Sequence, residues 1–181
     1  MNHRYWPLLA AFVALGVTAA DGNLDVTRSK LIATFRQEGV PVDAPFRVFS
    51  GTISYDPARP AAASAALDVD TASFDLGDES YSAEVRKPAW FDSTAFPRAT
   101  FRSTAVKANG ATQFNATGVL TLKGRVTTVT VPVTVQQVGK DTVYSGTLTI
   151  SRAAYAIGDP AWKDVLDDKV AVSFSLVTKG H

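Results

Sequence analysis

Side chains that could support catalysis are sparse in this sequence, and two aspartates come first. Asp68 and Asp70 are two residues apart on one face of an expected strand. Paired carboxylates can carry out acid–base chemistry, as in glycoside hydrolysis. Leu67 and Val69 take the alternate positions, so the two aspartates are expected to face water. A secreted hydrolase that uses Asp68 and Asp70 therefore remains only a minor alternative.

The other common catalytic groups are also scarce. The chain has no cysteine, and its two histidines are His3 and His181. These counts exclude disulfides, thiol nucleophiles and cysteine–zinc sites, and they argue against a Ser-His-Asp triad. The acidic residues Asp164, Asp167 and Asp168 do not have the spacing of a calcium loop, so we interpret them as a solvated turn. The sequence predicts no metal site and no catalytic site.

Composition narrows the class of protein further. Among 181 residues, 18 are Lys or Arg and 17 are Asp or Glu, which gives a formal net charge of +1. Binding of nucleic acid through net charge needs a basic surplus, so it is not expected here. Hydrophobic residues make up 46% of the chain, which is typical of a folded domain with a core.

The first twenty residues have the layout of a secretory signal peptide. A short basic start ending at Arg4 precedes the apolar stretch Leu8–Val17, and the small residues Ala19 and Ala20 precede a polar segment. The apolar stretch is shorter than a membrane-spanning helix requires. We therefore expect cleavage near Ala20 and a mature domain over residues 21–181 in the periplasm.

Apolar and polar residues alternate with period 2 through most of the mature chain, which predicts strands with one buried face. Eight strands are expected, over residues 31–36, 46–55, 65–72, 100–106, 114–122, 128–135, 144–150 and 170–176. Asn109-Gly110, Lys123-Gly124 and Gly139-Lys140 are hairpin signals between them. Residues 78–87 predict one short helix, which Pro88 ends. This all-β pattern indicates either a β-sandwich or a single antiparallel sheet closed into an eight-stranded barrel. Closure would remove exposed edge strands, and such a barrel has a lumen for one slender ligand.

Several short motifs occur in the order and with the spacing that is typical of one protein family. They are Phe46–Pro57 (FRVFSGTISYDP), Trp90-Phe91-Asp92 with Phe96–Ser103 (FPRATFRS), Gly118–Gly124 (GVLTLKG), Val131-Pro132-Val133, and Ser151–Gly158 (SRAAYAIG). The mature chain resembles the YceI family of lipocalin-like periplasmic proteins that bind polyisoprenoids. The sequence departs from the family at Arg28-Ser29, where many members have His-Ser, so no role of that histidine is carried over.

The resemblance implies a barrel whose lumen holds a long isoprenoid chain, either a polyprenyl lipid or a ubiquinone-like molecule, without catalysis or a covalent cofactor. Arg152 meets the polar head group or forms a structural ion pair. A transient inner-membrane partner is also implied, and delivery of quinone to a cytochrome b-type redox protein is the alternative. The expected ligand-binding residues are Phe46, Phe49, Ile53, Trp90, Phe91, Phe101, Leu120, Leu122, Leu148 and Phe174.

Overall fold

A computed structural model describes residues 20–56 and 58–180. Its single sheet contains ten strands, namely β1 (Ala20–Asn23), β2 (Lys30–Gln37), β3 (Val40–Pro45), β4 (Phe49–Tyr55), β5 (Ser64–Asp70), β6 (Arg98–Ala108), β7 (Gln113–Leu122), β8 (Arg125–Val138), β9 (Asp141–Ser151) and β10 (Lys169–Thr178). The expected signal peptide lies outside the described residues except for Ala20, so the structure does not test it.

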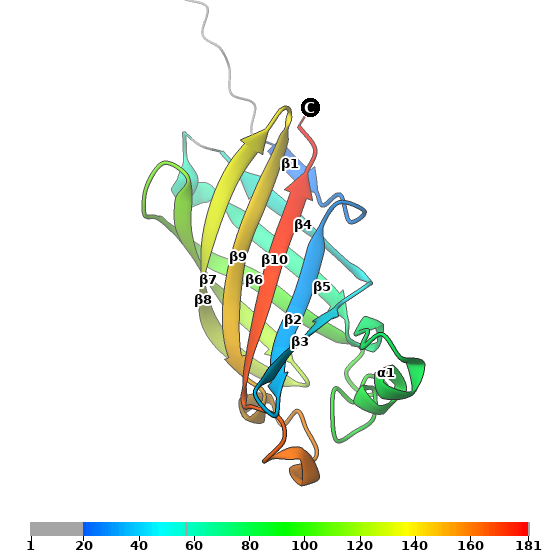
Figure 1. The fold of residues 1–181 in the computed structure, drawn as a ribbon. Helices are drawn as coiled ribbons and strands as arrows, with labels where there is room; N and C mark the ends of the chain where they lie inside the picture. Colours follow the sequence, from blue (N-terminus) through cyan, green and yellow to red (C-terminus); the bar gives the residue numbers. More distant parts are fainter. Residues whose placement is uncertain (1–19, 57, 181) are drawn as a thin grey trace, which may run out of the picture.

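All strand pairs are antiparallel, in the order β1-β4-β5-β6-β7-β8-β9-β10-β2-β3. Strands β4 to β10 follow one another through hairpins or loops, and the sheet curls strongly, as Figure 1 shows. At Lys123 and Gly124 both φ angles are positive, which is the geometry of the tight turn expected there. The hairpins at Asn109-Gly110 and Gly139-Lys140 are likewise confirmed.

The prediction of a closed eight-stranded barrel is wrong. The sheet is a half-barrel of ten strands, two of which, β1 and β3, were not predicted. These two strands form the margins of the sheet, and they do not pair with each other in a continuous ladder, so the barrel is not closed. At one end the Asp25 N–H donates to the Val177 carbonyl at 2.8 Å. An isolated bridge links Phe46 to Phe74. The outer strand β3 contains Pro41 and Pro45, which lack N–H donors and suit an edge position.

Two irregularities shape the wall of the half-barrel. A β-bulge between Ser103 and Ala105 shifts the register of β6 against β7. As a result Val106 lines the interior, whereas Ala105 is exposed. Pro132, which lacks an N–H donor, lies where the β8–β9 ladder ends, at the pair Val133–Gly146.

Helices occupy loops of the sheet, and all except one, which lies in the β4–β5 loop, are at the end where β5 leads to β6 and β9 leads to β10. The expected helix is α1 (Glu79–Val85), where the Asp78 carboxylate accepts hydrogen bonds from the Ser80 and Tyr81 amides. Four short 3-10 helices are η1 (Pro60–Ala62), η2 (Thr71–Ser73), η3 (Ala153–Tyr155) and η4 (Pro160–Trp162). In residues 20–56 and 58–180 no helix is long and apolar enough to cross a membrane.

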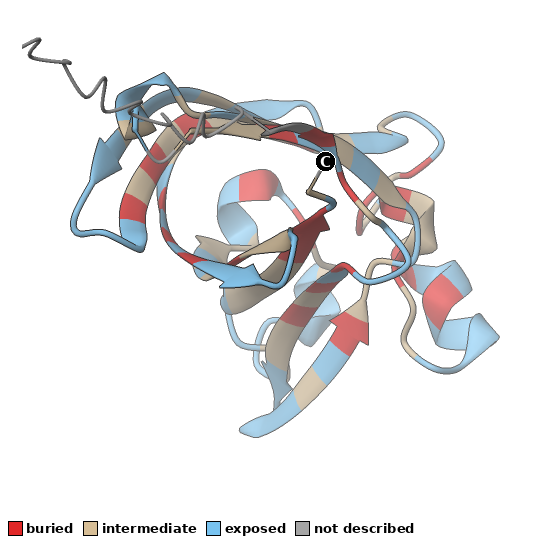
Figure 2. Cartoon of the chain, turned by 90° about the horizontal axis from the view of Figure 1, so that it is seen from above, coloured by how far each residue is buried: buried red, intermediate tan, exposed pale blue. Residues whose placement is uncertain are grey.

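Buried residues form two clusters inside the curled sheet. One includes Phe114, Tyr144 and Leu176, toward the end where β8 turns into β9. The other includes Trp90 and Phe91 and lies at the end of the sheet where α1 is found. Figure 2 shows buried and exposed residues alternating along the strands, as the period-2 pattern predicts.

Candidate functional site: an apolar cavity inside the half-barrel

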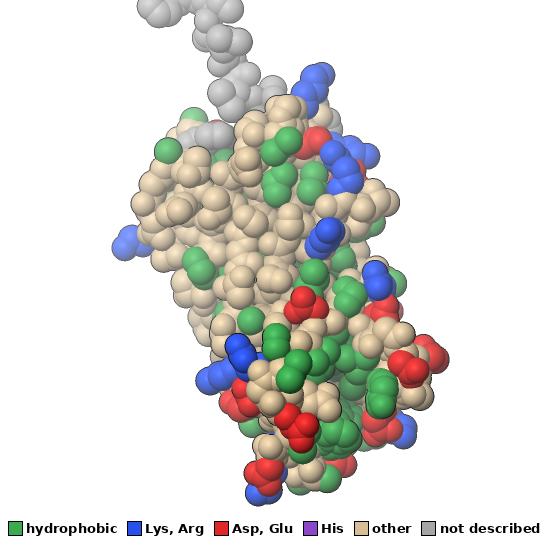
Figure 3. All heavy atoms as spheres, viewed as in Figure 1, with side chains coloured by type: hydrophobic (Ala, Val, Ile, Leu, Met, Phe, Trp, Pro, Cys, Tyr) green, Lys and Arg blue, Asp and Glu red, His purple; other side chains and the backbone are tan. Residues whose placement is uncertain are grey.

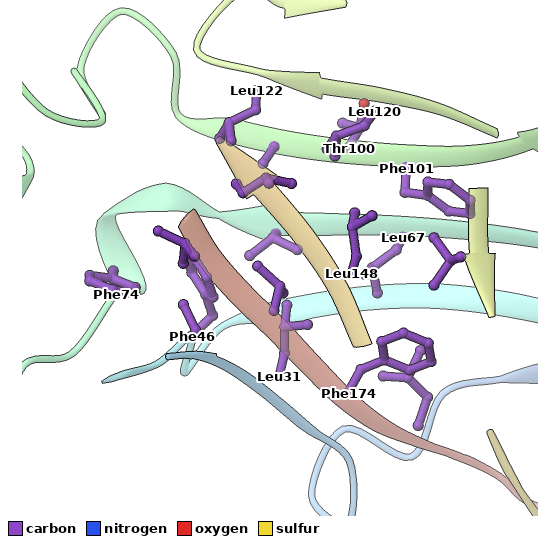
Figure 4. A pocket seen from close by; sticks show the side chains of 18 of the residues that line it. Leu31, Phe46, Leu67, Phe74, Thr100, Phe101, Leu120, Leu122, Leu148 and Phe174 are labelled. Carbon is purple, nitrogen blue, oxygen red and sulfur yellow. The ribbon is translucent and has the colours of Figure 1, made fainter. Parts of the chain in front are cut away.

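A cavity of about 530 Å³ runs between the two buried clusters. Most of its lining is aliphatic or aromatic, and side chains from β2 to β10 and from α1 contribute to it. Figure 4 shows Leu31, Leu67, Leu148 and other labelled side chains pointing into it from different strands. This volume lies within the range of small-molecule sites, about 300–1,000 Å³.

Strand alternation explains which residues reach the cavity. On β9 the lining residues are Tyr144, Leu148 and Ile150, each an even step along the strand, and Arg152 lies just beyond its end. β10 contributes the even-numbered set Val170, Val172, Phe174 and Leu176. Successive side chains of a strand point to opposite faces, so the odd-numbered neighbours face outward.

Two glycines give room for phenylalanine rings along the wall. A Cβ atom on Gly118 would lie 2.5 Å from Cζ of Phe101, and one on Gly146 would lie 2.6 Å from Cζ of Phe174. Each ring therefore lies over the glycine of the neighbouring strand instead of projecting into the lumen. This arrangement keeps two large aromatic residues in the lining while leaving the space between them open.

Nine of the ten residues expected to bind ligand line this cavity. They are Phe46, Ile53, Trp90, Phe91, Phe101, Leu120, Leu122, Leu148 and Phe174. Phe49 does not line it; the residue packs partly against the core and also borders a small surface pocket with Asp70 and Arg98. The structure thus brings nine of the side chains together, and whether they contact a ligand stays a prediction.

Trp90 and Phe91 also hold the α1 region against the sheet. The Phe91 ring packs edge-on to Phe46 and Phe74, with ring centroids 5.9 and 5.2 Å away. Trp90 packs edge-on to Trp162 of η4, with ring centroids 6.5 Å apart. These residues therefore anchor the helix and also line the cavity.

The cavity opens at the end where α1 and η4 lie. Tyr81 and Trp162 line it there, yet 64% and 41% of their surfaces remain exposed. Figure 3 shows hydrophobic side chains gathered at this end among acidic and basic ones. The charged lining residues are Glu84, Arg152 and Asp167, which belong to α1 or to the segment between β9 and β10. We call this end the mouth.

Arg152 was expected to meet a head group or to form a structural ion pair. Its guanidinium donates to three backbone carbonyls, and contact with a head group stays a prediction. Arg152 Nε donates to the Asp167 carbonyl at 3.0 Å, and its two Nη atoms donate to the carbonyls of Ile157 and Leu166 at 3.1 and 2.8 Å. These bonds hold the 153–168 segment against the mouth. The guanidinium also has N–H groups beyond these three bonds, because arginine carries five donors.

A lysine ties the loops of this end together. Lys123 Nζ donates to the carbonyls of Pro88 and Ala156, both at 2.7 Å. Burial lowers the pKa of Lys123, and the charge of Asp92 opposes this effect. The β7–β8 turn is thereby fixed to the loop after α1 and to η3.

At the opposite end the rings of Tyr55, Phe114 and Tyr144 pack together, and a group of ion pairs lies nearby. Arg28 lies 2.9 Å from the Asp25 carboxylate and 2.6 Å from the Asp141 carboxylate. Lys179 also contacts Asp25, at 3.4 Å. The hydrogen bond from the Thr27 hydroxyl and then that from Arg28 hold the pKa of Asp25 well below its ordinary value. Arg28, which replaces the family's histidine, thus takes part in a structural ion-pair group.

The two aspartates considered for catalysis lie away from the cavity. Arg102 Nη2 donates to both carboxylate oxygens of Asp68, at 2.9 and 2.8 Å. The Asp70 carboxylate accepts from the Ala72 amide and caps η2. Both therefore have structural partners on the outer surface. Among the described residues, no group of three His, Cys, Asp or Glu could hold a metal ion.

Some cavity residues were not singled out from the sequence. Leu31, Phe114, Tyr144 and Leu176 all line the cavity, and all fall on the inward phase of expected strands. Their alternation could have identified them. Tyr81, by contrast, lies on α1, and no sequence pattern indicated that this helix borders the opening.

The curled antiparallel sheet and its internal cavity define an apolar β half-barrel. The chain belongs to the YceI-like domain family, which matches residues 23–178. Protein YceI of Shigella flexneri is 32% identical over 128 residues, which is 69% of this chain and 64% of that relative. The aligned part is thus slightly less than two thirds of that relative's length.

Two solved structures have a similar fold. BcnA of Burkholderia cenocepacia is 42% identical, with a TM-score of 0.84 over 86% of this chain and 99% of that chain. A domain from Saccharophagus degradans, described as polyisoprenoid-binding and implicated in plant cell wall breakdown, is 20% identical. Its TM-score is 0.72 over 90% of this chain and all of that one, which establishes a shared fold.

Proposed function

We propose that this protein is a non-enzymatic binding or carrier protein for a long-chain isoprenoid lipid, either a polyprenyl lipid or a ubiquinone-like molecule. The observation that carries the proposal is the apolar cavity of about 530 Å³. Nothing in this lining requires a reaction, since an apolar enclosure is sufficient to hold an apolar chain. The description of the Saccharophagus degradans domain as polyisoprenoid-binding supports the same ligand class.

The energetics of burial favour such a ligand. A tail that buries about 400 Å² of apolar surface gains about 10 kcal/mol at roughly 25 cal/mol per Å². Association costs of about 4–15 kcal/mol offset much of this gain. The net result is a reversible complex, which suits a carrier that must also release its cargo.

The distribution of charge sets the orientation of the cargo. Glu84, Arg152 and Asp167 line the mouth, whereas the interior is apolar. Burying a polar head group without partners is costly. The isoprenoid tail therefore enters first, and the head group stays at the mouth, within reach of the Arg152 guanidinium.

The test compares two variants that place the same charged group on opposite faces of β9. Leu148→Glu places a carboxylate in the cavity, whereas Thr149→Glu places the same group on the exposed outer face of β9. Each protein is purified and analysed by native mass spectrometry, followed by organic extraction of bound material. We expect a prenyl lipid with the wild type and Thr149→Glu, and an empty protein with Leu148→Glu.

Wild-type protein that stays empty, even after incubation with ubiquinone and undecaprenyl lipids, would overturn the carrier proposal. Turnover of a glycoside that Asp70→Asn abolishes would instead favour the hydrolase alternative. Extraction of a quinone, with a cytochrome b-type protein crosslinked to the carrier, would favour delivery to a redox partner.

We also propose a periplasmic location, reached through cleavage of residues 1–20. Support comes from the basic, apolar and small-residue order of that segment. Cell fractionation and the intact mass of the mature chain test this directly. A full-length protein in the cytoplasmic fraction would contradict it.

A further inference from the structure

The closed end of the cavity is formed by aromatic rings that meet across the lumen. Tyr55 of β4 and Tyr144 of β9 pack edge-on, with ring centroids 6.1 Å apart, although four strands separate β4 from β9 in the sheet. Phe114 of β7 stacks on Tyr55 at 5.8 Å. We call Tyr55, Phe114 and Tyr144 the aromatic floor.

The floor is where the cavity ends. Tyr144 is only 2% exposed, and Phe114 is also buried. Beyond the floor, the inward residues Val135 and Thr178 are buried, but neither lines the cavity. Burial against the surroundings also raises the pKa of the Tyr144 hydroxyl. The cavity is therefore blind at this end, in contrast to the mouth, where Tyr81 and Trp162 are exposed.

The depth of the cavity follows from strand geometry. Its lining on β9 begins at Tyr144, and the strand ends at Ser151, just before Arg152. At about 3.3 Å per residue these seven steps cover about 23 Å, or roughly 18 Å along the axis for a strand tilted by about 40°. One isoprene repeat contributes four carbon–carbon bonds of about 1.5 Å to the chain, so an extended repeat is roughly 5 Å long. The cavity thus accommodates about four repeats.

We infer that the aromatic floor limits the enclosed part of an isoprenoid chain to about four repeats, and that its residues determine this chain-length preference. The inference rests on the proposed function, because it concerns the same cavity. A chain with more repeats fills the cavity up to the floor and leaves its remaining repeats and head group outside the mouth. Repeats beyond the fourth then add no enclosed apolar contact.

The test uses linear prenyl alcohols with two, three, four, five and nine repeats, with binding followed by quenching of tryptophan fluorescence. For the wild type we expect affinity to rise roughly tenfold per repeat up to the fourth, since each repeat removes more apolar surface from water, and then to level off. Tyr55→Ala removes part of the floor and should move the plateau to the fifth repeat.

Ala116→Phe tests the opposite direction. Ala116 lies two residues from Phe114 on the same face of β7 and lines the cavity. A ring there raises the floor and should move the plateau to the third repeat. Phe49→Ala is the matched control, since it removes a ring from β4 that does not line the cavity, and its plateau should stay at the fourth repeat.

The two proposals fail in different ways. Circular dichroism first establishes which variants fold, and either floor variant alone suffices for the comparison. If alcohols bind but folded floor variants keep the wild-type plateau, the floor does not set chain length and the carrier proposal stands. If the wild type binds no alcohol of any length, both proposals are overturned.

Discussion

The packing of Phe101 over Gly118 gives a sharp test of how the cavity is kept open. Gly118 has an ordinary strand conformation, so the need for glycine there is a matter of space. An added Cβ would lie 2.5 Å from Cζ and 2.6 Å from Cε2 of Phe101, and 2.6 Å from the Arg102 carbonyl oxygen. Gly118→Ala must therefore displace the Phe101 ring, and the open side of that ring is the lumen.

The expected cost can be divided between stability and binding. Overpacking at such a site costs about 1–3 kcal/mol. Phe101→Leu removes the ring clash, so in the double variant we expect about 1 kcal/mol of the Gly118→Ala cost to be recovered. If the displaced ring denies the ligand about 60 Å² of apolar contact, binding weakens by about 1.5 kcal/mol, or roughly tenfold.

The energetic coupling between positions 118 and 101 is measured by urea unfolding of the wild type, both single variants and the double variant. Binding is measured by titration with prenyl alcohols. Gly110→Ala is the control, because an added Cβ at Gly110 meets nothing within 4 Å and the residue has no positive φ. It should leave both quantities nearly unchanged. Strictly additive free energies of unfolding for Gly118→Ala and Phe101→Leu would refute the reasoning.

Three further predictions concern the two ends of the half-barrel. Folding lowers the pKa of Asp25, so the contribution of its carboxylate to stability is complete above the unfolded pKa of about 3.9 and is lost as the pH falls below that value. Asp25→Asn should therefore flatten the fall in melting temperature across that acidic range, and an unchanged slope would contradict this. Lys123→Met removes the hydrogen bonds to Pro88 and Ala156 and should cost about 1–2 kcal/mol in urea unfolding, with unchanged stability as the contrary result. Arg152→Lys cannot reproduce the three-carbonyl fork and should increase hydrogen exchange in residues 153–168; wild-type protection there would show that the fork does not hold the segment.

The inward faces of the long strands could be predicted from the sequence because side-chain direction alternates strictly. Leu120, Leu122, Leu148 and Phe174 reach the cavity for this reason. The same rule would place Phe49 with Ile53. Phe49 pairs with Val69 and packs against the core as expected, but at the first position of β4 it does not line the cavity.

Closure of the sheet could not be predicted in the same way. The missed strand β3 follows a hairpin at Glu38 and Gly39, both with positive φ, but its two prolines hide the strand pattern. The margins meet through contacts between residues far apart in sequence, which local patterns do not encode. The aromatic floor is another such case, since only the fold brings Tyr55 and Tyr144 together.

The pairing of β2 with β10 has a consequence for the order of events during folding. These strands belong to opposite ends of the chain, and the hydrogen bond from Ser173 Oγ to the Ile32 carbonyl spans 141 positions. Hairpins from β4 onward join strands that are close in sequence and can form early, but β2 has to wait for β10, the last strand of the sheet in chain order. The lumen is therefore incomplete until β10 has paired with β2, and a ligand that needs the whole enclosure can bind only after that step.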